Sequence, residues 1–327
     1  MSDEPDRESV RQRYRTFSRY EAQGVSPLYE AFSEAVASDD SAIDFLLALP
    51  REKQQPNLLL AACRWVCGVA DSRERFLGNL QENAGAIRHV MLTRATQTNE
   101  PARCATLLPV LAQLPQPLAL IEVGVSAGLC LYPDRYRYRY RYGDYSIGSS
   151  DPPAPEFHCL PNDGTPLPDR PPQVAFRAGI DLNPLDVRNR GEMDWLETLV
   201  WPEQTERLNN LRRAIALAGQ DPPNLTSGDL LAALPAVAGN VPRDAHLVIF
   251  HSAVLAYVPE SDRRRFVSLV GDLDATWISN EHPAVLPEIA ASLQERPPLD
   301  RFLLAVNGTP VASTGPHGQS INWLVRE

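Results

Sequence analysis

The residues whose types and spacing best suit ligand chemistry lie in one short segment of the chain. Gly124 and Gly128 enclose this segment, and Ser126 lies midway between them. Glycine adopts backbone conformations with positive φ and lets a ligand approach the main chain, and amide N–H groups at such a turn attract polar or anionic groups. We therefore expect a tight turn that offers free peptide N–H groups to a cofactor.

The turn follows a segment that predicts a buried strand. Residues 118–123 are nearly continuously apolar, Pro115 and Pro117 precede them, and Gly124 follows. A short apolar run with such boundaries is typical of a strand buried on both faces of a parallel sheet. Glu122 is the charged residue of this run.

Strands and helices alternate through the rest of the chain. Apolar runs predict further strands at residues 174–176, 246–250, 276–279 and 302–306. Amphipathic segments predict helices at residues 100–113, 205–218 and 261–273. This alternation indicates an α/β fold with a mostly parallel sheet, and the two runs on either side of Gly308 indicate a C-terminal antiparallel hairpin.

The N-terminal part of the chain has a different pattern. From residue 8 to about residue 114, apolar residues recur at three- and four-residue spacing, which indicates helices. We therefore expect a helical region at residues 1–114 and an α/β domain at residues 115–327. Prolines are dense at about residues 132–173, which predicts an extended loop insertion that faces the substrate.

The segment from Glu122 to Gly128 resembles the first motif of Rossmann-like S-adenosylmethionine-dependent methyltransferases, an acidic residue followed by three alternating glycines. Ser126 departs from this pattern because it occupies the middle glycine position. The resemblance implies a Rossmann-like sheet and S-adenosylmethionine as the cofactor. It places Glu122, Gly124, Ser126 and Gly128 beside that cofactor, and it predicts that Gly124→Val abolishes binding.

Two aspartates extend the resemblance. Asp181 lies in segment 179–184, which looks like the end of the family's second strand, whose acid contacts the ribose hydroxyls. Asp229 lies in segment 227–230, which is similar to the later turn whose acid lies near the adenine. The alternative for each aspartate is a loop or helix cap.

Polar residues also precede the first predicted strand. Asn99, Glu100 and Arg103 stand at the start of the helix predicted at residues 100–113, from which they could reach the cofactor. Alternatively, Asn99 caps this helix and Glu100 complements its dipole, which is the interpretation we favour.

Two residues are candidates for catalysis. Methyl transfer depends mainly on positioning, and a base is needed only when the acceptor is protonated. His251 and Tyr257 lie in segment 246–257, which looks like the family's fourth strand and the loop after it. The alternative for His251 is a ring that is satisfied by neighbouring backbone.

Most of the chain also resembles an uncharacterised bacterial group, the domain of unknown function 2332 family. The matching segments occur in order, at residues 96–100, 122–128, 179–184, 201–204, 251–257 and 307–308. Because this family has no established activity, the resemblance supports the fold more than the reaction.

Two other function classes stay open. The turn also matches the nucleophile elbow of α/β-hydrolases, with Ser126 as nucleophile and, as partners, Asp229 or Asp274 and His282 or His317. Against it, the elbow normally follows several strands, whereas everything before the first predicted strand here looks helical. The third possibility is a protein that binds a nucleotide-like ligand without turnover.

Arginine and tyrosine alternate at residues 135–142. In a strand, this alternation places guanidinium groups on one face and rings on the other. Anion binding or base stacking is one interpretation. We favour the other, in which the rings pack in the core and the arginines pair with carboxylates.

Composition narrows the class of protein. The formal net charge of -10 opposes nucleic-acid binding, and no apolar run approaches the length of a membrane span. Five cysteines and a polar N-terminal segment predict reduced thiols in a cytoplasmic protein. The histidines have no second ligand at metal-binding spacing, so we expect no metal. We expect the substrate to be a small molecule.

Overall fold

The computed structural model describes residues 3–97, 99–141, 145–148, 154–293, 298 and 300–324. It divides into two compact units, residues 1–98 with 193–208, and residues 99–192 with 209–327. Whether these units are the domains expected on either side of residue 114 stays a prediction.

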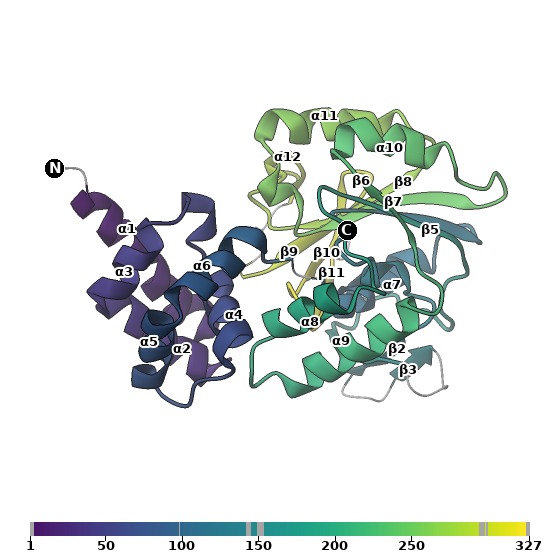
Figure 1. The fold of residues 1–327 in the computed structure, drawn as a ribbon. Helices are drawn as coiled ribbons and strands as arrows, with labels where there is room; N and C mark the ends of the chain where they lie inside the picture. The colour runs from purple at the N-terminus through teal and green to yellow at the C-terminus, as the bar shows by residue number, and fades with distance from the viewer. Residues whose placement is uncertain are drawn as a thin grey trace. The chain divides into compact units, whose positions relative to one another are not determined.

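The first unit is helical (Figure 1). Its elements are α1 (Asp3–Phe17), η1 (Ser18–Ala22), α2 (Pro27–Ser38), α3 (Asp40–Leu47), η2 (Arg51–Lys53), α4 (Pro56–Cys67), α5 (Arg73–Glu82) and α6 (Ala84–Thr93). Ser26 and Asp39 begin α2 and α3, because their side chains accept hydrogen bonds from backbone N–H groups of the first turn. Inside, the rings of Phe32 and Phe76 stack with centroids 4.6 Å apart.

A later stretch of the chain completes this unit. Residues 193–208 contain the end of α8 (Arg190–Leu199) and the start of α9 (Thr205–Ala218). Trp195 is buried in the unit's apolar core, and the ring of Trp201 contacts that of Tyr29 at 5.6 Å. Glu203 accepts hydrogen bonds from the Ser26 hydroxyl at 2.8 Å and from the Leu28 amide at 3.0 Å.

The second unit is built on one sheet. Its strands are β1 (Leu118–Val123), β2 (Arg137–Tyr140), β3 (Tyr145–Gly148), β4 (Glu156–Pro161), β5 (Val174–Asp181), β6 (Asn224–Ser227), β7 (His246–Ser252), β8 (Thr276–Glu281), β9 (Phe302–Val306), β10 (Thr309–Thr314) and β11 (Ser320–Trp323). Their order is β3-β2-β4-β11-β10-β9-β8-β7-β1-β5-β6, and the neighbours from β8 to β6 are all parallel. The predicted α/β fold with a mostly parallel sheet is confirmed.

Helices cover this sheet. They are η3 (Pro101–Arg103), α7 (Cys104–Leu111), η4 (Leu129–Leu131), α10 (Leu230–Ala238), η6 (Leu255–Tyr257), α11 (Glu260–Gly271) and α12 (Pro287–Ala290). Helices α10 and α11 lie over the same face of the sheet (Figure 1), where Leu234 and Phe266 join the apolar cluster of Ile121 and Ile249. Every residue of β1 is buried, as its continuous apolar run predicts.

The antiparallel pair at the C-terminus forms as expected. Strands β9 and β10 pair antiparallel, and β10 pairs antiparallel with β11. Asn307 and Gly308 connect β9 to β10 with φ of 47° and 76°. Positive φ at both central residues matches the right-handed twist of the flanking strands, which explains the Asn-Gly pair.

The proline-rich segment contains more regular structure than expected. Strands β2, β3 and β4 lie within residues 132–173, where a loop insertion was predicted, and the other described residues of this segment, which are the majority, are outside these strands. Prolines flank the strands without breaking them: Pro155 precedes β4 and Pro161 is its last residue. At these positions a missing amide donor costs little.

The arginine–tyrosine alternation forms β2. Tyr136, Tyr138 and Tyr140 are fully buried, and each hydroxyl donates to a backbone carbonyl at 2.6–2.7 Å. On the other face, Glu156 pairs with Arg139 at 2.8 Å and with Arg137 at 3.4 Å. The packing interpretation is therefore confirmed for these residues, and Tyr142 lies outside the described part of the chain.

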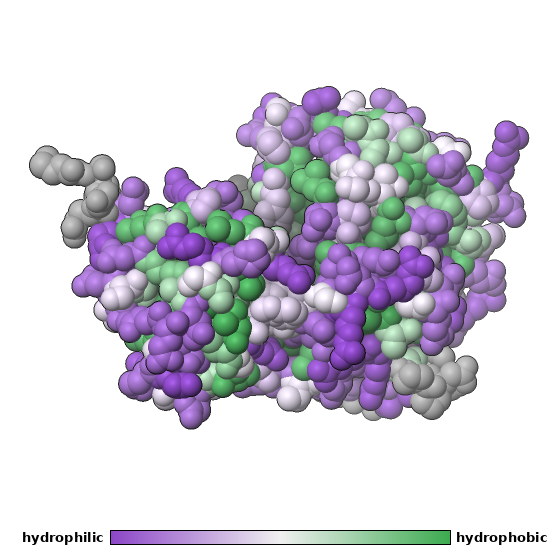
Figure 2. All heavy atoms as spheres, in the orientation of Figure 1, coloured by the Kyte–Doolittle hydropathy of each residue, from purple (hydrophilic) through white to green (hydrophobic). Residues whose placement is uncertain are grey.

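The visible surface mixes hydrophilic and hydrophobic residues, with the hydrophobic ones in scattered patches (Figure 2). Within the described residues, no helix combines the length and the apolar character needed to cross a membrane.

Candidate functional site

The carboxyl ends of four parallel strands position the candidate site. Because β5, β1, β7 and β8 are parallel neighbours, their carboxyl ends meet at one edge of the sheet. The turn at residues 124–128 follows β1, Asp181 ends β5, residues 253–254 follow β7, and Glu281 ends β8. The segments expected to bind a ligand are thus brought together at this edge.

The turn after β1 has the expected conformation. Gly124, Ser126 and Gly128 all have positive φ, at 72°, 49° and 74°. Such angles cost a serine more than a glycine, because its Cβ crowds the backbone. Ser126 therefore adopts a left-handed backbone conformation that favours glycine.

The amide groups of this turn are not free, contrary to expectation. Gly124 and Val125 donate to the carbonyl of Ile180 at 2.8 and 3.2 Å, and Gly128 donates to the carbonyl of Val125 at 2.8 Å. The Ser126 amide donates to Asp181 Oδ2 at 2.9 Å. The prediction of free peptide N–H groups was wrong at these positions, because the turn is closed by its own hydrogen bonds.

Asn99 fastens the turn from the preceding segment. Its Nδ2 donates to the Val125 carbonyl at 2.8 Å, and its Oδ1 accepts from the Leu129 amide at 3.0 Å. The side chain neither caps a helix nor points its amide to solvent. Its role in this structure is to hold both ends of the glycine turn.

Glu100 and Arg103 are both buried. Glu100 is the N-cap of η3 and accepts from the Ala102 amide at 3.3 Å, so the prediction that Asn99 is the cap was wrong. The Arg103 guanidinium donates to the carbonyls of Ser252 at 2.9 Å and Pro316 at 2.8 Å, and it lies over the ring of Phe302. Arg103 thereby connects the end of β7 to the segment after β10.

The protein's own side chains fill the space beside the glycines. A Cβ on Gly124 would lie 2.3 Å from the nearest methyl carbon of Val254, and a Cβ on Gly179 would lie equally close to Val125. Glycine is required at both positions because the neighbouring strands and loops pack so closely. The face of Gly124 that a cofactor was expected to use is in contact with Val254.

The two aspartates differ in their surroundings. Asp181 is half-buried, and its oxygens accept one amide hydrogen each, from Ser126 and from Asn183, both at 2.9 Å. A carboxylate oxygen has a second lone pair, so Asp181 keeps capacity for further donors. Asp229 is the N-cap of α10, where Oδ1 accepts from the amides of Leu231 and Ala232.

Two polar atoms near the turn have no hydrogen-bond partner among the described residues. They are Glu122 Oε2 and Ser126 Oγ. Glu122 is only 5% exposed, and burial raises the pKa of its carboxyl well above the ordinary value. The Cys130 thiol raises this pKa further, whereas the Arg103 guanidinium lowers it.

His251 is enclosed by protein. Its ring is 0% exposed, its Nδ1 lies 2.7 Å from Glu281 Oε1, and the Trp277 indole donates to its Nε2 at 3.0 Å. An indole N–H can only donate, so Nε2 is an acceptor and the proton sits on Nδ1. The ring is therefore neutral, and neither nitrogen is available to a substrate in this arrangement.

Tyr257 has the opposite environment. It ends η6, in the loop after β7, and is 84% exposed. Of the two predicted catalytic side chains, it is the one whose hydroxyl solvent and ligands can reach.

Glu281 was not selected from the sequence as a site residue. Its Oε1 accepts from His251 Nδ1 and from the amides of Val254 and Leu255 at 2.9 and 3.1 Å. One carboxylate oxygen thus organises the end of β7 and the loop that packs on Gly124. The available signal was an acid at the end of a buried strand, the same signal that marked Glu122.

The hydrolase residues are not arranged as a triad. Ser126 Oγ is buried and has no partner among the described residues, and His317 Nδ1 lies 3.6 Å from Glu100. Asp274 precedes β8 and His282 follows it. A strand of this length separates its two ends by roughly 20 Å. These two residues cannot form one hydrogen-bonded dyad in this fold.

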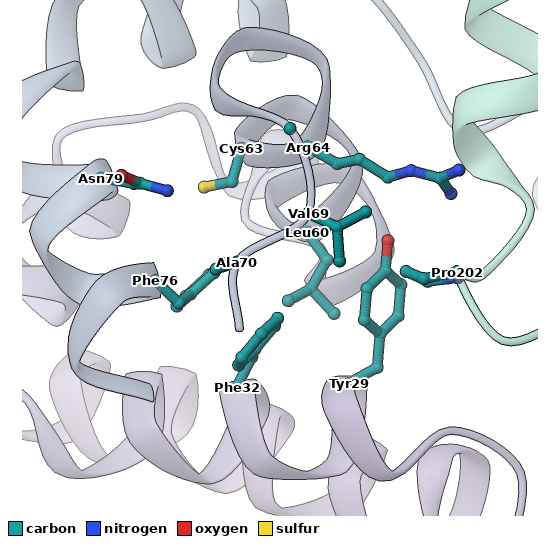
Figure 3. A pocket seen from close by; sticks show the side chains of 11 residues that line it. Tyr29, Phe32, Leu60, Cys63, Arg64, Val69, Ala70, Phe76, Asn79 and Pro202 are labelled. Carbon is teal, nitrogen blue, oxygen red and sulfur yellow. The ribbon is translucent and has the colours of Figure 1, made fainter. Parts of the chain in front are cut away.

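The first unit has a small pocket of its own, with room for about one water molecule. Figure 3 shows the rings of Phe32 and Phe76 beside it and the Tyr29 hydroxyl directed toward Val69 and Arg64. Burial raises the pKa of Tyr29 to about 12. The Arg64 guanidinium donates to the carbonyls of residues 198 and 200 at the end of α8, so its main role here is structural.

Among the described residues, no group of three or more histidines, cysteines, aspartates and glutamates is placed to hold a metal ion.

Comparison with known proteins identifies one relationship. The sequence model of a family described as "Uncharacterized protein conserved in bacteria (DUF2332)" matches residues 11–74 and 68–323. No curated protein and no solved structure matches the chain.

Proposed function

This chain belongs to the DUF2332 family of bacterial proteins, and we propose that its second unit binds S-adenosylmethionine and acts as a methyltransferase on a small-molecule acceptor. The observation that carries the proposal is the order of the strands around β1. After β1 the chain forms β2, β3 and β4 at the far edge of the sheet, and it then places β5 and β6 on one side of β1 and β7 and β8 on the other side. In doubly wound sheets, ligands bind at the carboxyl ends of the strands where the order reverses.

The residues at this point suit a nucleoside better than an anion. The turn amides are largely consumed by protein acceptors, so the N–H contacts that would hold a phosphate or carboxylate are few. Asp181 is half-buried and keeps lone pairs, as an acceptor for ribose hydroxyls must. Its bond to the Ser126 amide also fixes the carboxylate against the turn. These features support a Rossmann-like, methyltransferase-type site.

Other residues of the chain would orient and enclose the ligands. S-adenosylmethionine, when bound, supplies a methyl group on a positively charged sulfur. Asn99 holds the turn in shape, and Arg103 holds the end of β7. His251 is a positioning residue in this proposal, because it acts through Glu281 on the loop that packs against Gly124. Tyr257 is the exposed candidate for contact with the acceptor.

The test is calorimetric titration of the full chain with S-adenosylmethionine and S-adenosylhomocysteine. We expect saturable binding of both, and we expect Asp181→Asn to weaken it about tenfold or more, because a lost charge-assisted hydrogen bond has that effect. Asp229→Asn is the matched control: it makes the same chemical change at a residue whose carboxylate is engaged as the N-cap of α10.

The thermal unfolding midpoint of both variants shows whether the fold is intact. Absence of binding by the folded wild-type chain at ligand concentrations up to about 1 mM would refute the proposal. Equal affinities for wild type and Asp181→Asn would refute the role of Asp181. Binding without methyl transfer to any acceptor would identify a ligand-binding protein instead of an enzyme.

A further inference from the structure

The loop after β10 lies at the same edge of the sheet as the candidate site. Strand β9 is antiparallel to both β8 and β10, so β10 runs parallel to β8 and their carboxyl ends meet at one edge. Residues 315–319 form this loop, and His317 lies in it. One guanidinium connects the loop to β7, because Arg103 donates to the carbonyls of both Ser252 and Pro316. The residue before His317 is thereby held beside the end of β7.

The backbone of this loop is held by its neighbours. The Gly318 amide donates to the Gly315 carbonyl at 2.9 Å, which closes a tight four-residue turn. A Cβ on Gly318 would lie 2.1 Å from the Ala102 carbonyl oxygen, so the turn packs directly against the backbone of η3. The His317 amide donates to Gln319 Oε1 at 2.9 Å. These contacts fix the backbone position from which the His317 ring projects.

The His317 ring lies between a buried carboxylate and solvent. Its side chain is 54% exposed, and its Nδ1 lies 3.6 Å from Oε2 of Glu100, whose side chain is 4% exposed. The other carboxylate oxygen of Glu100 accepts from the Ala102 amide, so the carboxylate is held in place. Within the described part of the chain, Nε2 of His317 makes no hydrogen bond.

This arrangement determines which ring nitrogen of His317 is free to act. A carboxylate only accepts hydrogen bonds, so Glu100 favours the neutral ring with its proton on Nδ1 and a lone pair on Nε2. The same carboxylate stabilises the imidazolium that forms when Nε2 takes a proton. In ligand-free structures the bond between a base and its orienting group is often long and tightens in the reacting complex, so 3.6 Å fits this role.

A second histidine–glutamate pair shows that exposure and distance alone do not define the site. His158 is 57% exposed, and its Nε2 lies 3.5 Å from Glu156. Glu156 also pairs with Arg137 and Arg139, and four strands separate β4 from β7. The two pairs differ in their place in the sheet, and the pair that contains His317 is the one at the candidate site.

We propose that His317 is the general base of the proposed methyl transfer and that Glu100 is its positioning residue. Nε2 accepts the proton of an acceptor hydroxyl group while the hydroxyl oxygen forms its bond to the methyl carbon. The carbon–sulfur bond breaks, and its electron pair stays on the sulfur, which becomes a neutral thioether. The histidine leaves the step as an imidazolium and returns its proton to solvent.

This inference rests on the proposed function and adds the class of acceptor. A carboxylate is already deprotonated at neutral pH and needs no base, whereas an alcohol or a phenol must lose its proton during the transfer. The products are therefore methyl ethers.

The first test needs no acceptor. Nuclear magnetic resonance of the full chain, labelled with ¹⁵N at its six histidines, shows which ring nitrogen carries the proton at about pH 8.5, where histidine rings are ordinarily neutral. We expect the proton of His317 on Nδ1, and Glu100→Gln should move it toward Nε2. Added S-adenosylhomocysteine should shift the ring signals of His317 saturably and leave those of His158 unchanged.

The second test follows a labelled methyl group from S-adenosylmethionine into the small molecules of a bacterial extract. We expect labelled methyl ethers, and we expect His317→Gln to lower the rate about hundredfold or more, which is the ordinary contribution of a general base. The affinity of this variant for S-adenosylhomocysteine should stay unchanged. His158→Gln is the matched control, because it makes the same substitution at a histidine of similar exposure and should keep the wild-type rate.

The outcomes separate this inference from the proposed function. Absence of S-adenosylhomocysteine binding would remove the proposed function, and with it the reaction that His317 serves. If the ligand binds, three results would each overturn the role of His317 alone: unshifted His317 signals, a proton on Nε2 in the wild-type ring, or the wild-type rate in His317→Gln. Binding without transfer to any compound of the extract would overturn it as well. The wild-type spectra decide the position of the proton even if Glu100→Gln does not fold.

Discussion

One buried glutamate lies near the carboxyl end of β1 and another lies at the carboxyl end of β8, and the surroundings of the two carboxyl groups differ. At β1, Glu122 lies beside a turn whose amides are consumed by protein acceptors and whose glycine is covered by Val254. At β8, Glu281 Oε1 accepts three hydrogen bonds, from His251 and from the amides of Val254 and Leu255, and thereby organises the neighbouring loop. Both glutamates keep one buried oxygen without a partner among the described residues, so the two ends differ in what surrounds the carboxyl group: a closed glycine turn at β1, and a loop that the carboxylate itself holds at β8.

The largest expected effect concerns the packing of the β1 turn. Gly124→Ala places a Cβ 2.3 Å from Val254 at a φ of 72°, so we expect a loss of about 3 kcal/mol or more in the free energy of unfolding. Urea denaturation measures it. Gly308→Ala is the control, because Gly308 has a φ of 76° and open space around it, and its cost should be about 1 kcal/mol.

For the same reason, loss of ligand binding in a variant with a larger side chain at Gly124 would not show that a ligand contacts this residue. Gly124→Val would disrupt the packing of the turn, whether or not a cofactor contacts it. The double variant Gly124→Ala with Val254→Ala should recover part of the lost stability. Equal costs for Gly124→Ala and Gly308→Ala would contradict the close packing.

The second prediction tests the buried glutamate of β1 by its dependence on pH. The pKa of Glu122 is raised by burial, so the folded chain holds its proton more tightly than the unfolded chain does. Its contribution to stability is fully present below the unfolded pKa of about 4.3 and is lost as pH rises through the folded value. Glu122→Gln removes this loss, so the variant should gain on wild type as pH rises.

The gain should approach about 1.4 kcal/mol per pH unit above the unfolded pKa, until the folded pKa is reached. Urea denaturation of wild type and Glu122→Gln at pH 5 and pH 7 measures the difference. Glu288→Gln, at an exposed position, is the control. A difference that shrinks as pH rises would have the wrong sign for a buried acid with a raised pKa.

The third prediction tests the ring system that supports Glu281. Trp277→Phe removes the donor to His251 Nε2 and leaves that nitrogen buried without a partner, so we expect a loss of about 2 kcal/mol. A double-mutant cycle with His251→Phe isolates the pairwise contribution, which should be about 1 kcal/mol. Strict additivity of the two substitutions would show that the hydrogen bond contributes nothing.

The smallest effect is expected at Ser126. Its φ of 49° and its unpartnered hydroxyl both destabilise the folded chain with serine at this position. Glycine removes both, but it also raises the entropy of the unfolded chain, which offsets part of the gain in stability. Ser126→Gly should therefore raise the free energy of unfolding by no more than about 1 kcal/mol. Ser126→Ala keeps the positive φ and removes the hydroxyl, so the two thermal midpoints separate these causes. A clear destabilisation by Ser126→Gly would contradict the strain at this residue.

The fold was predictable where local pattern and burial agree. The apolar runs at β1 and β9 have the predicted bounds, because a strand that is buried on both faces has a simple hydrophobic signal. Strand β6 reads Asn-Leu-Thr-Ser and carries little of that signal. It pairs with β5 through backbone hydrogen bonds that no local pattern reveals.

The candidate site was predictable in its location and less so in its chemistry. Parallel strands bring the ends of β1, β5 and β7 to one edge, which the α/β pattern implies. What each side chain does there depends on distant partners. His251 is neutral and enclosed because its Nε2 accepts from Trp277, which lies 26 residues further along the chain. Glu281 is important because it accepts hydrogen bonds from three donors in β7 and the loop after it.

The stretch at residues 193–208 has a consequence for synthesis and dissection of the chain. It supplies Trp195, Trp201 and Glu203 to the interior and caps of the first unit. On the ribosome, this unit cannot reach its final packing until residue 208 has emerged, after a large part of the second unit has already been made. A fragment that stops at residue 98 would expose the apolar surface that Trp195 and Trp201 cover, so expression of the helical unit alone calls for a fusion that restores these residues.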